Sequence, residues 1–239
     1  MTPSPVAFRG RPARAGSALS LCFALGVAAL VAPSALGRSV VGVAAVGAAG
    51  TVAAPVLGRR WHRAVGVLSS TGGGAAVCLA VGLAAVLPGP LTGRAPLVAA
   101  LAGVFALALG LVPVVDRWTG GFRAAGATLL VLAAVARSAL SPVGAWHAPV
   151  TVAFAVLAWD SASTAAIVGE RAGDGRETAL RTAVHAAGSV AVGAVAAGAA
   201  VALYGLPPAN LPLLALAALG GAAVAATLAL YSLVPPPER

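Results

Sequence analysis

The 239-residue sequence is 60% hydrophobic and only 9% charged, and its net charge is +9. Soluble domains carry roughly 25% charged residues, so this chain has too few charges to cover a water-facing surface. Its basic residues form short clusters between apolar stretches rather than one basic face with stacking aromatic rings, which excludes a nucleic-acid-binding protein. The composition predicts an all-α membrane protein whose main surroundings are the lipid bilayer.

A helix that crosses a membrane needs about 20 predominantly apolar residues. Eight stretches of the sequence meet this requirement: residues 16–36, 39–57, 64–87, 96–115, 123–141, 148–169, 182–205 and 211–234. We expect these spans to form a single transmembrane domain over residues 16–234. A basic amino-terminal segment (1–15) precedes the domain, and a short tail (235–239) follows it.

Glycine and proline mark the expected boundaries between the spans. Gly37-Arg38 is predicted to form a very tight turn between the first two spans, while Pro88-Gly89-Pro90 and Pro207-Pro208 break later ones. Pro96 and Pro149 suit the first turn of a helix, where a missing backbone N–H is tolerated.

The 15 basic residues are all arginines, and their distribution predicts the orientation of the chain. With eight spans and the amino terminus inside, twelve arginines fall in cytoplasmic segments and three, Arg38, Arg94 and Arg137, fall on the outer side. Cytoplasmic loops carry an excess of arginine, so both termini are expected in the cytoplasm of a multi-pass protein of the cell membrane. Alternatively, residues 18–32 are the core of a cleaved signal peptide, which would leave seven spans.

Asp160 is the most conspicuous polar residue within a span, because a carboxylate inside the bilayer costs about 2.5 kcal/mol or more. Its expected partner is Arg137 in the fifth span, which lies about 7 Å from it in depth on a straight-helix estimate. We interpret the two as a structural ion pair. The alternatives are an ion or proton site at Asp160, or an exposed position where the lipid is thinned.

A second group of polar residues flanks the connection between the sixth and seventh spans. Glu170, Arg176, Arg181 and His185 are predicted to form a cytoplasmic surface for a partner protein, because no other segment combines so many charges. His185 is expected about one turn inside the seventh span, roughly 9 Å from Asp160 in depth, so that direct contact would need water or a shifted helix.

The sequence carries no catalytic or metal-binding signature. It has no HExxH motif, no paired intramembrane aspartates, and no serine with a histidine at matching depth, so we expect no enzyme, no metal and no cofactor. Gly72-Gly73-Gly74 in the third span is interpreted as a site of close helix packing rather than an unwound ion-binding segment.

The segment from Leu157 to Gly193 carries the most specific pattern of the chain. This pattern is Trp159-Asp160, Gly169-Glu170 and Gly173, followed after a polar turn by His185-Ala186-Ala187 and Ser189. With these residues the chain resembles an uncharacterised family of small polytopic membrane proteins of halophilic archaea. The resemblance implies a domain of unknown function that is often encoded beside an AAA-type ATPase and transglutaminase-like membrane proteins.

These observations lead to two functional hypotheses. The first is a non-catalytic subunit or scaffold of a membrane assembly, whose cytoplasmic loops contact membrane or cytosolic proteins. The second is a small-solute or proton-coupled transporter that uses Asp160.

Overall fold

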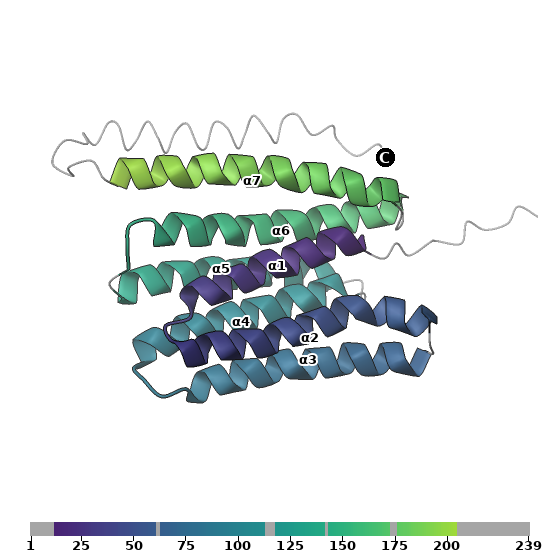
Figure 1. Cartoon of the computed structure of the whole chain (residues 1–239), viewed down its shortest axis with the longest axis horizontal. Coiled ribbons are helices and arrows are strands. Elements are labelled where there is room, and N and C mark those ends of the chain that lie inside the picture. Colours follow the sequence, from purple (N-terminus) through teal and green to yellow (C-terminus); the bar gives the residue numbers. More distant parts are fainter. Residues whose placement is uncertain (1–11, 61–62, 113–117, 142, 173–175, 205–239) are drawn as a thin grey trace, which may run out of the picture. The chain divides into compact units, whose positions relative to one another are not determined.

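The computed structural model of the chain describes residues 12–60, 63–112, 118–141, 143–172 and 176–204. Every regular element in these ranges is an α-helix, which confirms the predicted fold class (Figure 1). The helices are α1 (Arg14–Val31), α2 (Ala35–Arg60), α3 (Arg63–Val86), α4 (Leu91–Leu111), α5 (Thr119–Leu140), α6 (His147–Ala172) and α7 (Arg176–Tyr204).

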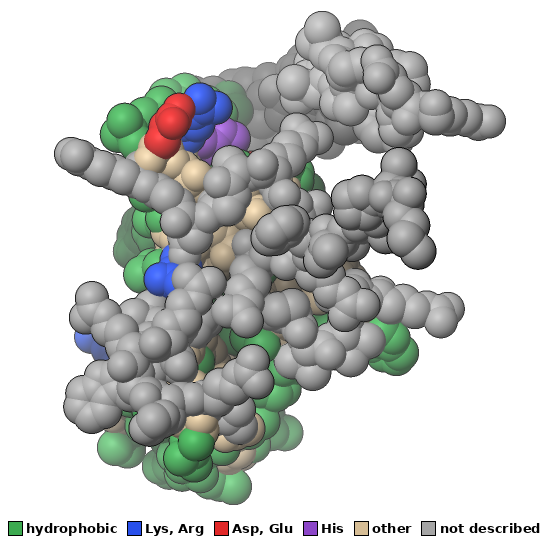
Figure 2. Space-filling model, turned by 90° about the vertical axis from the view of Figure 1, so that its right-hand side faces the viewer, with side chains coloured by type: hydrophobic (Ala, Val, Ile, Leu, Met, Phe, Trp, Pro, Cys, Tyr) green, Lys and Arg blue, Asp and Glu red, His purple; other side chains and the backbone are tan. Residues whose placement is uncertain are grey.

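All seven helices are long and apolar enough to cross a membrane, and they match the first seven predicted spans. Large apolar side chains are exposed on the outside of the bundle, as expected for a surface that meets lipid (Figure 2). The predicted eighth span (211–234), the tail (235–239) and most of the amino-terminal segment (1–15) lie outside the described residues.

The chain divides into two compact units, Met1–Val201 and Ala202–Arg239. The first unit contains α1 to α6 and nearly all of α7. Of the second unit, the structure describes only the last three residues of α7. The single domain predicted over residues 16–234 therefore stays a prediction.

The turn between α1 and α2 lies earlier than predicted. It consists of Ala32, Pro33 and Ser34, whereas Gly37 and Arg38 belong to the first turn of α2. Pro33 cannot continue α1, and the Ser34 hydroxyl accepts a hydrogen bond of 3.2 Å from the backbone N–H of Gly37. This N-cap explains why α2 begins directly after the serine.

The other proline boundaries follow the sequence more closely. Pro88-Gly89-Pro90 separates α3 from α4, and Gly89 has a φ of 131°, which only glycine adopts without strain. Pro149 lies in the first turn of α6, as predicted. Pro96 was expected in a first turn as well, but it lies inside α4 because this helix already begins at Leu91.

The core of the first unit is built around α1 and α4. α1 contacts α2, α4, α5 and α6, and α4 is the most buried of the seven helices. Fully buried side chains from the two helices fill this core: Ala24, Val27, Ala28, Val31, Leu97, Leu101, Val104 and Leu107. The first of the described helices thus contributes directly to the core of this unit.

Glycines bring several helix pairs into close contact. α3 runs unbroken through Gly72-Gly73-Gly74, and the backbone of Gly73 packs against that of Gly47 in α2. A β-carbon at Gly73 would lie 2.5 Å from the Gly47 carbonyl oxygen. Gly103 and Gly126 meet in the same way between α4 and α5. The triple glycine therefore serves close packing, as small residues do in membrane helices.

We expect Gly73→Ala to destabilise the protein by about 1–3 kcal/mol, because the added methyl group forces α2 and α3 apart. Gly72→Ala is the matched control, since a β-carbon at Gly72 meets nothing within 4 Å. Thermal unfolding of the two variants in detergent measures the difference. Equal melting temperatures would show that the contact does not limit the approach of the helices.

Candidate functional site

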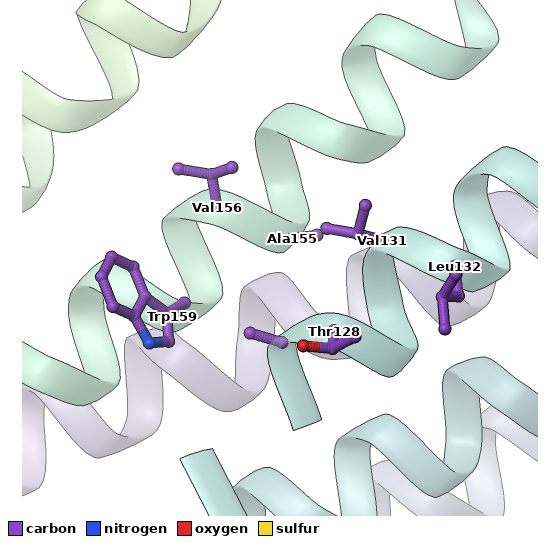
Figure 3. Close-up of a pocket in the computed structure, with 7 residues that line it drawn as sticks. Thr128, Val131, Leu132, Ala155, Val156 and Trp159 are labelled. Carbon is purple, nitrogen blue, oxygen red and sulfur yellow. The ribbon is translucent and has the colours of Figure 1, made fainter. Parts of the chain in front are cut away.

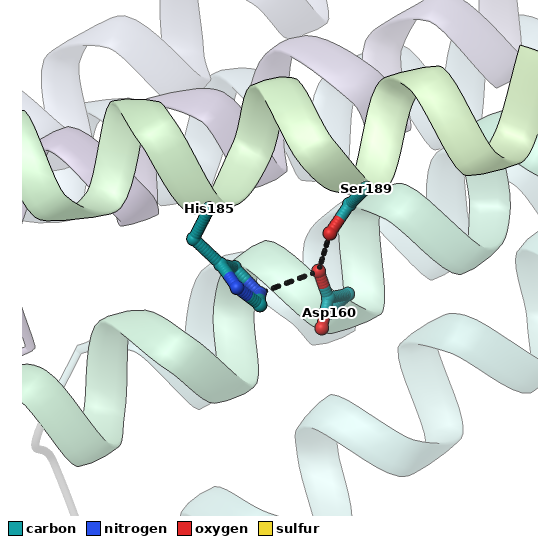
Figure 4. A network of polar contacts seen from close by, with 3 residues as sticks. All are labelled: Asp160, His185 and Ser189. Carbon is teal, nitrogen blue, oxygen red and sulfur yellow. Dashed lines mark hydrogen bonds and ion pairs between the residues drawn. The ribbon is translucent and has the colours of Figure 1, made fainter.

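Asp160 lies in the middle of α6 and makes two polar contacts with α7 (Figure 4). The Ser189 hydroxyl donates a hydrogen bond of 2.8 Å to Oδ2 of the carboxylate. Nε2 of His185 lies 3.0 Å from the same oxygen and forms an ion pair with it when the imidazole is protonated. One carboxylate oxygen therefore accepts two hydrogen bonds from the neighbouring helix.

The length of α7 explains why His185 reaches Asp160. The seventh span was predicted from residue 182, but α7 already begins at Arg176, so His185 lies nine residues into the helix rather than three. Nine residues correspond to about 14 Å along the axis, and the twelve residues from Asp160 to the end of α6 correspond to about 18 Å. The two side chains are thus at similar depth and bond directly, without the water that the sequence estimate required.

The structure does not bring Arg137 and Asp160 together. Arg137 lies three residues before the end of α5, whereas Asp160 lies thirteen residues after the start of α6, an offset of ten residues or about 15 Å in this antiparallel pair. Nη1 of Arg137 instead donates a hydrogen bond of 2.8 Å to Ser141 Oγ, and its Nε is buried without a hydrogen-bond partner. The expected structural pair is replaced by the contact of Asp160 with α7.

The residues proposed for the cytoplasmic surface are described only in part. Arg181 donates to Glu177 at 2.7 Å, in an ion pair between residues four apart on α7, and both side chains are more than 70% exposed. Figure 2 shows acidic, basic and histidine side chains gathered together on this face. The side chains of Glu170 and Arg176 lie outside the described part, so their membership of the surface stays a prediction.

An open groove of about 300 Å³ lies between α5 and α6 (Figure 3). It is lined by Ala127, Thr128, Val131, Leu132, Ala155, Val156 and Trp159. Thr128 is the only polar residue of the lining, and its hydroxyl already donates to the Ala124 carbonyl. Asp160 does not line the groove, so the groove suits apolar chains rather than a polar solute.

The Asp160 cluster does not have the arrangement of a catalytic triad. In a triad the histidine accepts the proton of the serine, whereas the Ser189 hydroxyl donates directly to the carboxylate. Within the described residues, no group of three histidine, cysteine or acidic side chains is placed to hold a metal ion. What the cluster can do is join α7 to α6 through two polar contacts.

Sequence reasoning included Asp160 and His185 as separate residues but left Ser189 out of the site. A signal for the cluster was present, because His185 and Ser189 are four residues apart and therefore share one face of a helix. Two hydrogen bonds at α1 and its N-cap were also missed: the Ser20 hydroxyl donates to the Ala158 carbonyl of α6 at 2.7 Å, and Ala13 N–H donates to Ala165 O. The close packing of Gly16 against Ala165 was missed as well.

The apolar helices and the intramembrane polar cluster define a multi-pass α-helical membrane protein. The chain belongs to a family of unknown function, DUF7519, which matches residues 68–227. This finding agrees with the resemblance to an uncharacterised family. Neither the curated proteins nor the solved structures provide a match to the chain.

We expect Asp160 and His185 to be energetically coupled. In a double-mutant cycle of Asp160→Ala and His185→Ala, the interaction energy should be about 1 kcal/mol or more, because a hydrogen bond to a charged group is lost. The matched cycle of Asp160→Ala with Arg137→Ala should be additive within about 0.5 kcal/mol. Denaturant unfolding in mixed micelles measures both cycles. A larger interaction energy for Asp160 with Arg137 than for Asp160 with His185 would identify Arg137 as the partner of Asp160.

Proposed function

We propose that the protein is a non-catalytic subunit of a membrane assembly, located in the cell membrane with both termini in the cytoplasm. Its partner is a protein that binds the charged beginning of α7. The resemblance noted for residues 157 to 193 suggests an AAA-type ATPase or a transglutaminase-like membrane protein for this role.

The observation that carries this proposal is the exposure of α7. α7 is the least buried of the seven helices, and its first two turns carry the exposed pair of Glu177 and Arg181. An isolated exposed ion pair contributes little to stability. Because these charges contribute so little to the stability of the helix, they are available to bind a partner of complementary charge. Charged side chains at the edge of an interface also speed the association of two proteins.

The twelve arginines assigned to the cytoplasmic side support the same orientation. In this topology the connection between α6 and α7 faces the cytoplasm, so Glu177 and Arg181 are accessible to a cytosolic protein or to the cytosolic part of a membrane protein. The opposite ends of the helices would face outward.

Replacing Arg176 and Arg181 by glutamate should reduce the recovery of co-purifying proteins at least tenfold from mild detergent, because the surface then repels an acidic partner. The matched control is the double exchange Glu177→Arg with Arg181→Glu, which keeps the ion pair within α7 but reverses its direction. If the partner recognises the positive charge at position 181, the recovery of co-purifying proteins also falls for this double exchange. Unchanged recovery of the co-purifying proteins in all variants would show that this surface does not bind a partner.

A second candidate function is proton-coupled or small-solute transport through the Asp160 region. It is favoured by the partly covered carboxylate of Asp160 in the middle of α6 and the exposed imidazole of His185 beside it, because intramembrane ionisable residues commonly mark transport paths. The neighbouring groove has a mainly apolar lining, in which the Thr128 hydroxyl is already bonded within its own helix, so the subunit role is the better supported function.

Purified protein in liposomes tests the transport function. If Asp160 couples transport, an imposed pH gradient should drive proton flux in the wild type, and Asp160→Asn should lower this flux at least tenfold because it removes the carboxylate. Arg137→Gln is the control, since Arg137 bonds to Ser141 and not to the cluster. Equal flux in the wild type and Asp160→Asn would exclude coupling through Asp160.

A further inference from the structure

Three side-chain nitrogens within the described residues are buried without a hydrogen-bond partner, and two of them belong to the end of the bundle where α5 connects to α6. These two are Nε of Arg137, in the last turn of α5, and Nε2 of His147, the first residue of α6. The third is Nε of Arg94 in α4. Buried polar atoms in proteins almost always have a partner, so two unpartnered nitrogens in one place indicate a site for a ligand.

Arg137 and His147 lie at the same level of the bundle. Arg137 comes three residues before the end of α5, about 5 Å along the axis, and α6, the antiparallel neighbour of α5, starts at His147. The guanidinium and the imidazole interact electrostatically, so the two side chains are near each other. His147 is only 7% exposed, which means that its ring lies beneath the surface of the protein. The two unpartnered nitrogens thus belong to one local cluster.

The contact between Arg137 and Ser141 determines which donors remain for a ligand. Nη1 of Arg137 donates to Ser141 Oγ at 2.8 Å, which fixes the orientation of the guanidinium group. The opposite edge of this group carries Nε–H parallel to an N–H of Nη2, and such an edge matches two oxygens of one oxyanion. Because Ser141 Oγ accepts from the arginine, its own hydroxyl proton is available for a third hydrogen bond.

The backbone at the start of α6 contributes little to this cluster. The N–H of His147 already donates to the Gly144 carbonyl at 2.9 Å. The N–H of Val150 donates to the Trp146 carbonyl at 3.2 Å, and Pro149 has no N–H. The donors of the cluster are therefore side chains and not the end of a helix.

The charge of this end of the bundle favours an anion. Residues 137–147 include one arginine and one histidine but no aspartate or glutamate. Asp160 lies thirteen residues beyond His147 on α6, about 20 Å along the axis, and its carboxylate bonds to α7. A partly buried guanidinium without a carboxylate in its own segment is stabilised when a ligand brings the negative charge.

Trp146 indicates the level of the cluster in the membrane. It is 51% exposed, and its ring lies edge-on to the His147 imidazole with 5.4 Å between the ring centroids. Tryptophan is enriched at the level of the lipid headgroups, and Arg137 and His147 lie at the ends of their helices. The cluster is therefore at the level where the phosphate groups of lipids lie.

We infer that Arg137, Ser141 and His147 form a binding site for a phosphate group. The Nε and Nη2 edge of Arg137 binds two phosphate oxygens, while the Ser141 hydroxyl and Nε2–H of His147 donate to the others. The phosphate belongs to the headgroup of a phospholipid or is free in solution, and the same donors suit both. The site goes beyond the proposed function, because it lies at the opposite end of α6 from the connection to α7 that carries the partner surface.

Isothermal titration calorimetry of the full-length protein in phosphate-free maltoside micelles tests the site. The probes are inorganic phosphate and, in a separate titration, phosphatidylglycerol, with diacylglycerol of the same acyl chains as the uncharged reference. We expect at least one phosphate probe to bind with one molecule per chain, and diacylglycerol to bind at least tenfold more weakly. Tighter binding of phosphatidylglycerol identifies a lipid site, and equal or tighter binding of inorganic phosphate identifies a site for free phosphate. Failure of both probes to bind overturns the inference.

Two variants remove different donors of the site. Arg137→Gln should weaken binding of the phosphate probe at least tenfold, because a bidentate contact to an anion is lost. His147→Phe should weaken it at least threefold, because this substitution keeps a buried ring but removes Nε2. If Arg137→Gln does not fold, His147→Phe decides the question. Unchanged binding in either folded variant overturns the inference.

Matched controls separate a defined site from general attraction between charges. Arg38→Gln removes an exposed arginine of α2 and should change the binding constant less than twofold. Arg137→Lys keeps the charge but loses the planar fork, so binding should still weaken at least threefold. Equal weakening in Arg38→Gln and Arg137→Gln, wild-type affinity in Arg137→Lys, or displacement of the phosphate probe by chloride at equal concentration would overturn the inference. Partner recovery and proton flux are separate measurements, so failure of either proposed function leaves these outcomes unaffected.

Discussion

The bundle depends on how closely the helix backbones can approach one another. Lipid is as apolar as leucine, so burying apolar side chains between membrane helices brings little advantage, and packing and hydrogen bonds decide which helices associate. In this protein glycines meet backbone to backbone between α2 and α3 and between α4 and α5. Hydroxyl groups then bond to carbonyl oxygens across helices, as Ser20 does to Ala158 and Ser69 to Gly50.

α7 is joined to the bundle in a different way. It is largely uncovered, and its polar contacts with α6 join His185 and Ser189 to a carboxylate side chain rather than a hydroxyl to a backbone carbonyl. Gly193 lies 3.8 Å or more from Leu157, measured from the position of an added β-carbon, so the two backbones are not tightly packed there. A helix attached through such a contact can change its position at lower cost than α1 or α4.

Hydropathy and arginine placement were sufficient to predict the helices but not their ends or their rotation. The start of α7 was missed because Arg176, Glu177 and Arg181 were counted as loop residues, although charged side chains are good helix formers and Glu177 and Arg181 support each other one turn apart. Because the predicted start of this helix was six residues too late, His185 and Asp160 were expected at different depths in the membrane. Estimated depth along adjacent spans favours Arg137 as the partner of Asp160, but hydropathy does not reveal that the Arg137 guanidinium bonds to Ser141 at the end of its own helix.

The burial of α1 has a consequence for biogenesis. This helix is made before the other described helices, yet the carbonyl that binds its Ser20 belongs to a residue 138 positions later in the chain. At a synthesis rate of about 5–20 residues per second, about 7 to 28 seconds pass before Ala158 of α6 has been made. During that interval α1 must keep its small polar face against α2 and α4, or against the insertion machinery, so correct assembly depends on the order in which the helices enter the bilayer.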